Sequence, residues 1–257
     1  MKIFDYLIDR FYYLIDGKKK RKLRIDTFLN FYFKQNNKKF IIQVGGNDGI
    51  NSDPLRKYLK KKGNYKVLII EPLNYYYKKL KKLYFKRKDI KIIKTAISNK
   101  IEKKFVYFID PKVVKEMNGK GPHNNWADGQ GSFDVEIVKY WIKKNSFRGY
   151  DYKKNIPKFI QSIKKESIIT KKISSINIPP NHNTLLIIDV QGYELEVIES
   201  INWRYAPKHI IYEDDLKIYN DRSNKIRNIL RTRGYKYIGG KYDKIFSKNK
   251  TRKLFFK

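Results

Sequence analysis

Cysteine is missing from the 257 residues of the chain, and histidine occurs only three times. The absence of cysteine excludes disulfides, thiolate nucleophiles and thiolate metal ligands. No apolar run approaches the roughly 18 residues that a membrane-spanning helix needs, and the N-terminus lacks the pattern of a secretory signal. These absences fit a reducing compartment, so we expect a cytoplasmic location.

Acidic residues are scarce, since 25 Asp and Glu face 59 Lys and Arg and leave a formal net charge of +34. Such a charge favours a polyanionic partner, namely nucleic acid, an acidic membrane surface or an anionic glycan. The same composition is rich in Lys, Ile, Asn, Tyr and Phe, the residues favoured by AT-rich coding. Composition alone leaves both explanations open.

The first residues have apolar side chains at helical spacing, followed by the basic run 18–22. One interpretation is a helix that lies on a membrane surface with a polybasic anchor, which makes the protein peripheral to a membrane. The other is a helix that packs on the domain. We favour packing, because Asp5, Asp9 and Asp16 would face an anionic surface poorly.

Strand and helix patterns alternate along most of the chain. Helices are predicted at about 3–15 and 24–35, and then at 54–62, 74–85, 134–144, 193–201 and 222–233. Strands are predicted at 40–44, 66–71, 90–94, 104–109, 184–189 and 209–213, and a closing hairpin surrounds Gly239 and Gly240. Apolar strands alternating with helices indicate an α/β fold with a mostly parallel sheet covered on both faces, and the hairpin adds an antiparallel strand at one end.

The alternation of strand and helix patterns is interrupted between residues 110 and 166. This segment includes the glycine- and asparagine-rich loop "NGKGPHNNWADGQGSF". Long loops inside a compact domain often cover or bind a ligand. We therefore expect an N-terminal helical extension over 1–36 and a single domain over 37–257, with an inserted lid or substrate segment at about 110–166.

Glycines and carboxylates follow the apolar strands where these end. They are the turn from Gly45 to Gly49, Glu71, Asp189, and the pair Glu213 and Asp214. In an open parallel sheet, ligands bind at the carboxyl ends of the strands. Glycines after one strand and an acid after the next are typical of nucleotide-type cofactor sites.

Several stretches resemble the FkbM-type methyltransferases: "FIIQVGGNDGINSDPL", "LIIEPL", "TAIS", "GSF" and, above all, "LLIIDVQGYELEVIES". They occur in order over about residues 40–240. The resemblance implies a class I, Rossmann-like methyltransferase domain with seven strands, the donor S-adenosylmethionine, and methylation of a hydroxyl oxygen. Members of the family commonly act on sugars, glycolipids, polyketides and other secondary metabolites.

The resemblance assigns donor-binding positions along the chain. They are Gln43, Gly45, Gly46, Asn47, Asp48 and Gly49 around the methionine part, Glu71 and Pro72 at the ribose, and Thr95 and Ala96 near the adenine. Two positions depart from the family pattern. Gln43 stands where many class I methyltransferases have an acid, and Gln191 replaces a carboxylate in the acid-Gly-acid arrangement of many relatives, which puts a role of that position as base or ligand in doubt.

An acceptor hydroxyl must lose its proton, to a general base or with the help of a metal. Asp189 would face the reaction centre. His182 and His209 precede or begin strands and should lie at the opposite end of the sheet, so His123 in the insertion is the remaining histidine candidate. Alternatively, Asp189, Glu213 and Asp214 could converge on Mg²⁺.

The acceptor is not specified by any motif. Trp126 could stack on a sugar ring, and Asp128, Ser132 and Gln191 are further candidates for contacts with a sugar, glycan or similar small molecule. Two other functions stay open. The aromatic and basic run "NYYYKKLKKLYFKRK" suggests an RNA methyltransferase, and loss of chemistry would leave a non-catalytic binding module.

Overall fold

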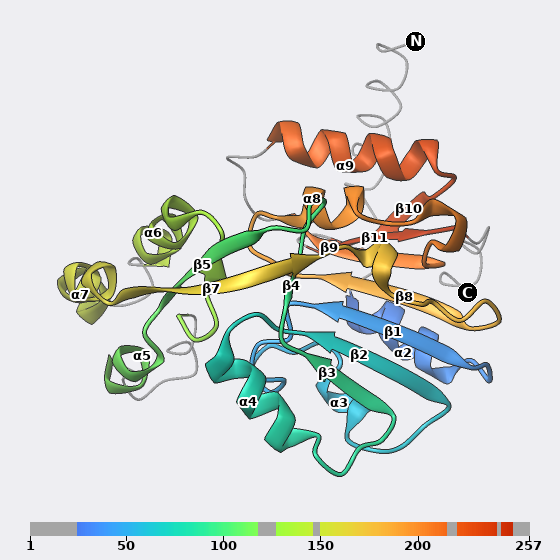
Figure 1. Cartoon of the computed structure of the whole chain (residues 1–257), viewed down its shortest axis with the longest axis horizontal. Coiled ribbons are helices and arrows are strands. Elements are labelled where there is room, and N and C mark those ends of the chain that lie inside the picture. The colour runs from blue at the N-terminus through green and yellow to red at the C-terminus, as the bar shows by residue number, and fades with distance from the viewer. Residues whose placement is uncertain (1–24, 118–126, 146–149, 215–219, 241–242, 249–257) are drawn as a thin grey trace.

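The computed structural model describes residues 25–117, 127–145, 150–214, 220–240 and 243–248. Its main layer is a seven-stranded sheet with the order β10-β11-β9-β8-β1-β2-β3 (Figure 1). The strands are β1 (Lys39–Val44), β2 (Tyr65–Ile70), β3 (Ile90–Ile93), β8 (Asn183–Ile188), β9 (His209–Glu213), β10 (Lys236–Gly239) and β11 (Asp243–Ser247). The predicted α/β, Rossmann-like fold with a mostly parallel seven-stranded sheet is therefore confirmed.

The antiparallel strand of this sheet is β11, which pairs with β9 on one side and β10 on the other. The closing hairpin expected at one end of the sheet forms there, with β11 between β9 and the edge strand β10. As a result Asp243, the first residue of β11, lies opposite Glu213, the last residue of β9.

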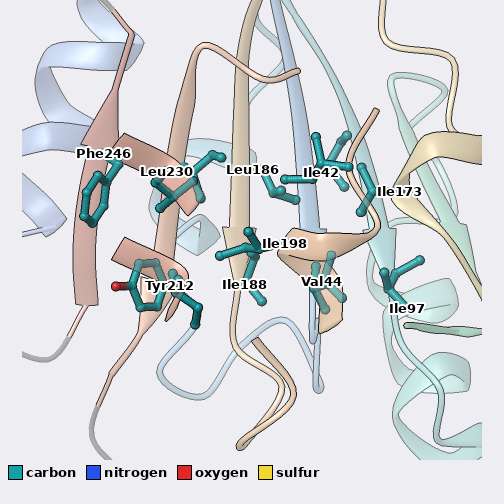
Figure 2. Close-up of a cluster of buried hydrophobic side chains, with 14 of the residues drawn as sticks. Ile42, Val44, Ile97, Ile173, Leu186, Ile188, Ile198, Tyr212, Leu230 and Phe246 are labelled. Atoms are coloured by element: carbon teal, nitrogen blue, oxygen red, sulfur yellow. The ribbon is translucent and has the colours of Figure 1, made fainter. Parts of the chain in front are cut away.

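Side chains alternate between the two faces of the sheet, as the period of two along a strand requires. Ile42 and Val44 pack in a cluster with α8 (Glu194–Glu199) and α9 (Asn220–Thr232), and Figure 2 shows Ile198 and Leu230 of these helices in it. Ile41 points to the other face, which α2 (Ile25–Lys34), α3 (Arg56–Leu59) and α4 (Asn74–Leu83) cover. Helices on both faces explain why the central strands are apolar throughout.

A second, four-stranded sheet has the order β4-β7-β5-β6 and lies beside the main one (Figure 1). Its strands are β4 (Ala96–Ile97), β5 (Lys103–Ile109), β6 (Gly131–Ser132) and β7 (Ile163–Lys171), and its helices are α5 (Pro111–Met117), α6 (Val135–Asn145) and α7 (Tyr150–Gln161). The strand expected at 104–109 thus belongs to this sheet. The described part of the segment 110–166 contains three helices rather than one, and the role of a lid stays a prediction for it.

Short 3-10 turns at Ile173–Ser175 and Trp203–Tyr205 complete the described elements. The helix predicted at 3–15 lies outside the described residues, whereas the one predicted at 24–35 is α2. The buried Tyr32 of α2 donates a hydrogen bond to the carbonyl of Asn183 at 2.6 Å. No helix in the described part of the chain is long and apolar enough to cross a membrane.

The two sheets meet near the carboxyl ends of β1 and β2. Leu73, which follows β2, packs there with Tyr76 of α4 and Val106 of β5. This contact sets the second sheet and the segment 127–133 over the strand ends, where the candidate site lies.

Candidate functional site

A cavity of about 650 Å³ opens at the carboxyl ends of β1, β2, β8 and β9. The segments that line it are 43–47, 51–54, 70–73, 95–97, 128–133 and 189–191, together with Val106, Trp141 and Glu213. All four strand exits singled out in the sequence therefore converge on one space, as expected for an open parallel sheet.

The charge of the cavity wall is opposite to that of the chain. The lining contains five carboxylates, and among the described lining residues there is no lysine, arginine or histidine. The carboxylates are Asp53, Glu71, Asp128, Asp189 and Glu213. In a chain of formal charge +34 this acidic lining favours neutral or cationic ligands and disfavours phosphates and carboxylates.

The glycine turn after β1 is held by backbone hydrogen bonds. The amides of Gly45 and Gly46 both donate to the carbonyl of Ile70, at 3.0 and 3.2 Å. Gly45 has φ +88°, and a Cβ at this position would lie 1.8 Å from the carbonyl oxygen of Asp189. Only glycine fits here, because both the positive φ and the close approach exclude a side chain.

Glu71 follows β2 at the cavity wall, and it is only 5% exposed. Its Oε2 accepts from the amide of Asn47 and its Oε1 from the amide of Leu73, both at 2.9 Å. Burial raises the pKa of Glu71 to about 7, although these backbone hydrogen bonds oppose the shift. The two amides fix the carboxylate at the cavity wall, and each oxygen retains a further lone pair for a ligand hydroxyl.

Gln43 and Asp53 form a second polar pair near the turn. Gln43 Nε2 donates to Asp53 Oδ1 at 3.3 Å, and the amide of Leu55 donates to the same oxygen at 2.8 Å. Burial raises the pKa of Asp53. Both residues line the cavity, and their remaining oxygens, Gln43 Oε1 and Asp53 Oδ2, are buried without a hydrogen-bond partner among the described residues.

The segment that follows residue 126 is tied to the glycine turn. Asn47 Nδ2 donates to the carbonyl of Asp128 at 3.2 Å, and the Tyr76 hydroxyl donates to Asp128 Oδ1 at 2.7 Å. The same hydroxyl accepts from the amide of Gly129 at 2.7 Å. Tyr76 is therefore buried and hydrogen-bonded, so its ring is not available to stack on a base of RNA.

Another part of the cavity wall is the turn after β8. Gln191 has φ +51°, and its Nε2 donates to both Asp189 Oδ1 and Glu213 Oε2, at 2.8 Å each. The buried Glu194 accepts from the amides of Gly192 and Val190, at 3.1 and 3.4 Å, and holds the turn in this conformation. The side-chain amide of Gln191 thus bridges two carboxylates at the strand ends.

Asp189 is open to the cavity, but protein surrounds it on the other sides, and this loss of bulk water raises its pKa. Its hydrogen bonds with Gln191 and Glu213 act in the opposite direction. Asp243 lies opposite Glu213, and its pKa is raised by burial and by the charge of Asp189. A carboxyl group with a raised pKa at a cavity wall, as Asp189 is, is a good candidate for a general base.

Most of the predicted site residues line this one cavity. They are Gln43, Gly45, Gly46, Asn47, Glu71, Pro72, Thr95, Ala96, Asp128, Ser132, Asp189, Gln191 and Glu213. Asp48 and Gly49 do not line it. Asp48 accepts from the amides of Ile50 and Asn51, both at 2.9 Å, and so shapes the turn rather than the wall.

His123 and Trp126 lie outside the described residues. His209 is buried at the opposite end of the sheet, where it contacts Asn183, as expected. Asp214 turns away from the cavity and bonds to Arg227 at 3.1 Å, with Lys244 at 3.8 Å. The described residues contain no group of three or more potential ligands that could hold a metal ion, so the prediction of magnesium gains no support from this end of the sheet.

Sequence reasoning missed several residues of the cavity. Asp53 precedes a proline that was interpreted only as a helix start, and Ser52 beside it has an unusual φ of +54°. Trp141 lines the cavity from α6, and Asp243 of β11 lies behind the lining, opposite Glu213. No local motif marks Asp243 or Trp141, because their positions depend on contacts between distant segments.

Residues 43–237 match the model of the Methyltransferase FkbM domain. No curated protein sequence matches the chain. Among solved structures, the methyltransferase FkbM from Methylobacillus flagellatus is 12% identical with a TM-score of 0.48; the match covers 87% of this chain but only 47% of that one.

Two further solved structures match the chain. A SAM-dependent methyltransferase from Aquifex aeolicus is 12% identical, covers 91% of this chain and 94% of its own, and has a TM-score of 0.41. Fibrillarin from Aeropyrum pernix, solved with natively bound S-adenosyl-L-methionine, is 8% identical, covers 91% and 71%, and has a TM-score of 0.38. Since the family model spans most of the sequence, the chain belongs to the FkbM family of S-adenosylmethionine-dependent methyltransferases.

Proposed function

We propose that the chain transfers a methyl group from S-adenosylmethionine to a hydroxyl oxygen of a neutral polyhydroxy molecule, such as a sugar or glycan. The observation that carries this proposal is the acidic cavity, which joins a donor end at Gly45 and Glu71 to an acceptor end at Asp189 and Glu213. Both ends open into the same space, so donor and acceptor can meet in it.

The residues at the donor end fit S-adenosylmethionine. The close approach of Gly45 to the backbone of Asp189 leaves a glycine cradle, and the fixed carboxylate of Glu71 suits a pair of ribose hydroxyls. When bound, S-adenosylmethionine supplies a methyl group that its sulfonium already activates. The protein then has to hold the acceptor oxygen in line with that methyl group and to exclude water.

Asp189 is the residue we assign to proton removal. The hydroxyl of the acceptor would donate to its carboxylate, and Asp189 would take the proton as the oxygen–carbon bond forms and the carbon–sulfur bond of the donor breaks. Its raised pKa makes it a better base than an ordinary aspartate, and the side-chain amide of Gln191 orients it at 2.8 Å. Glu213 on the other side of Gln191 shares the same amide and disperses the charge of the pair.

The acceptor class follows from the groups at this end. Asp189 and Glu213 are hydrogen-bond acceptors when ionised, and Gln191 Oε1 is buried without a partner among the described residues. A ligand here must therefore bring donors, which hydroxyl groups supply. Phosphates of RNA would meet five carboxylates and, among the described lining residues, no lysine, arginine or histidine, so the proposal of an RNA substrate has less support despite the basic charge of the chain.

The experiment that tests the proposal measures donor binding first and acceptor use second. Isothermal titration with S-adenosylhomocysteine should show binding, and its absence would leave a non-catalytic module. Release of S-adenosylhomocysteine is then followed with a panel of neutral methyl glycosides, the matching uronic acids and sugar phosphates, and mixed RNA oligomers. We expect turnover with neutral glycosides; turnover confined to RNA or to the anionic sugars would refute the proposed acceptor class.

A further inference from the structure

The region around α4 carries far more basic than acidic residues. Residues 55–94 contain 15 lysines and arginines but only two acidic residues, Glu71 and Asp89, whereas the whole chain has 59 against 25. Glu71 lines the cavity, and Asp89 is bound to Arg87 at 2.6 Å. Neither acid is therefore available to neutralise the lysines of this region.

Two turns bring many of these lysines together. One turn follows α3, and the other follows α4 at the lower rim of the molecule in Figure 1. Arg87 of the second turn donates to the carbonyl of Lys61 at 3.2 Å and to the Tyr65 hydroxyl at 3.0 Å, which fixes the two turns side by side. The exposed lysines of these turns and of the end of α4 are here called the lysine corner: Lys60, Lys61, Lys62, Lys81, Lys82, Lys86 and Lys88.

The lysine corner differs from other basic parts of the surface in its ion pairs. Among the described residues, none of its ammonium groups lies within 4 Å of a carboxylate oxygen. Lysines elsewhere do have such partners, for example Lys94 with Glu166 at 2.7 Å and Lys164 with Asp110 at 2.5 Å. A cluster of cations without paired acids attracts a polyanion.

An aromatic side chain is exposed among these lysines. Phe85 is 74% exposed, while its neighbour Tyr84 is buried in the core and anchors the turn. The ammonium of Lys86 lies 5.4 Å from the centre of the Phe85 ring. An apolar ring with ammonium groups beside it matches the boundary between the acyl chains and the headgroups of a membrane, because lysine stems can cover apolar surface while their charges stay in water.

We propose that the lysine corner and Phe85 dock the protein on an anionic phospholipid surface, with the lysines at the headgroups and the Phe85 ring at the acyl boundary. Each lysine near such a surface adds to the attraction, and an inserted ring adds apolar contact. The corner is distinct from the basic run 18–22 near the N-terminus. The proposal does not depend on the proposed function.

The position and chemistry of the corner favour lipid over nucleic acid. Proteins hold single-stranded nucleic acid in basic grooves with several stacking rings, whereas the corner as described offers Phe85 alone. The corner lies beyond the amino ends of β2 and β3, and the cavity opens at the carboxyl ends of the strands. RNA bound at the corner would therefore not be led to the cavity, but a membrane there leaves the cavity open to water.

Sedimentation of the full chain with two kinds of vesicle tests the proposal. One kind is phosphatidylcholine alone, and the other contains about one-third phosphatidylglycerol. We expect binding to the anionic vesicles only, and its loss as the salt concentration rises to about 0.5 M, because salt screens surface charges. Absence of binding to the anionic vesicles at low salt would overturn the proposal.

Two triple variants separate the lysine corner from the total charge. The corner variant combines Lys82→Gln, Lys86→Gln and Lys88→Gln. The matched control removes the same charge from exposed positions of β5 and β7, with Lys103→Gln, Lys165→Gln and Lys171→Gln. The corner variant should bind anionic vesicles about 100-fold more weakly, since each lysine near the surface contributes about fivefold, and the control should stay within about threefold. Equal losses in the two variants would show that net charge alone drives binding and would overturn the proposal.

The variant Phe85→Ser tests whether the partner is lipid. Loss of ring insertion should weaken binding to anionic vesicles about 10-fold and leave the affinity for mixed RNA oligomers within about twofold. Wild-type vesicle binding by Phe85→Ser would contradict the proposal, and so would a corner variant that loses affinity for RNA but not for vesicles. All the replaced side chains are exposed, so the thermal melts of the variants should match that of the wild type.

Discussion

The two ends of the cavity are held by different kinds of bond. At the donor end, the backbone amides of Gly45, Gly46 and Asn47 bond to the carbonyl of Ile70 and to Glu71. At the acceptor end, the side chain of Gln191 bridges the side chains of Asp189 and Glu213.

This difference has a consequence for substitution. Backbone bonds survive most changes of side chain, so the donor end depends on a few positions where only glycine fits. The acceptor end depends on the identity of each side chain, and a single replacement there changes its charge and hydrogen bonding. Four changes test the contrast, from the largest expected effect to the smallest.

The substitution Asp189→Asn should give the largest difference between its effect on turnover and its effect on donor affinity. We expect turnover on an identified acceptor to fall about 10²- to 10⁴-fold, because an amide cannot accept the hydroxyl proton. The affinity for S-adenosylhomocysteine should stay within about twofold, since the donor end keeps its backbone bonds. If the variant loses donor affinity but keeps its turnover at saturating donor, Asp189 contributes to donor binding and not to proton removal.

Gly45→Ala breaks the donor end through the backbone. A Cβ would lie 1.8 Å from the carbonyl of Asp189 at φ +88°, and we expect the free energy of unfolding to fall by about 2–4 kcal/mol with loss of S-adenosylhomocysteine binding. Gly234→Ala is the matched control, because Gly234 has φ +82° with nothing within 4 Å of its Cβ. Chemical denaturation should show a smaller loss for the control, of about 1 kcal/mol; equal losses would contradict the steric argument.

Gln191→Glu restores the acid found at this position in many relatives and sharpens the acceptor end. A third carboxylate beside Asp189 and Glu213 raises the pKa of Asp189 further. Because the base acts in its ionised form, wild-type turnover falls as the pH drops through the pKa of Asp189, and in the variant this limb moves to higher pH by roughly one unit. A pH profile that does not move, with donor affinity intact, would separate Asp189 from proton transfer.

Tyr76→Phe tests the tie between the glycine turn and the segment 127–133. It removes the hydroxyl that bonds to Asp128 and Gly129 at 2.7 Å, and we expect a loss of about 1–2 kcal/mol in the free energy of unfolding. The neighbouring Tyr75 is 43% exposed, so Tyr75→Phe should leave stability within about 0.5 kcal/mol. Thermal melts of both variants measure the difference, and equal melting temperatures would show that the tie contributes nothing.

The main sheet was predictable because its signals are local. Each central strand is an apolar run, and the glycines and carboxylates of the site follow these runs directly, as Glu71 and Asp189 do. Parallel strands bring their carboxyl ends to one edge, so sequence order alone gathers these residues.

The second sheet, the site residue Asp53 and its more distant neighbour Asp243 were not predictable in this way. Strand β7 has the sequence IKKESIITK, whose side chains are mostly exposed, and it pairs with β5 some 60 residues earlier. Asp243 reaches Glu213 only through the register of β11 against β9. Asp53 depends on the backbone at Ser52 and on contact with Gln43. Each requires knowledge of long-range pairing that the sequence pattern does not carry.

The insertion of β11 between β9 and β10 also sets an order of assembly on the ribosome. Residues 43–71, which form the donor end, leave the exit tunnel long before Asp243, and domains generally fold from the N-terminus as the chain is made. Until β11 arrives, β9 is a free edge with unpaired backbone groups beside Glu213. The strand that covers the edge of β9 beside Glu213 is therefore the last of the described strands to be synthesised.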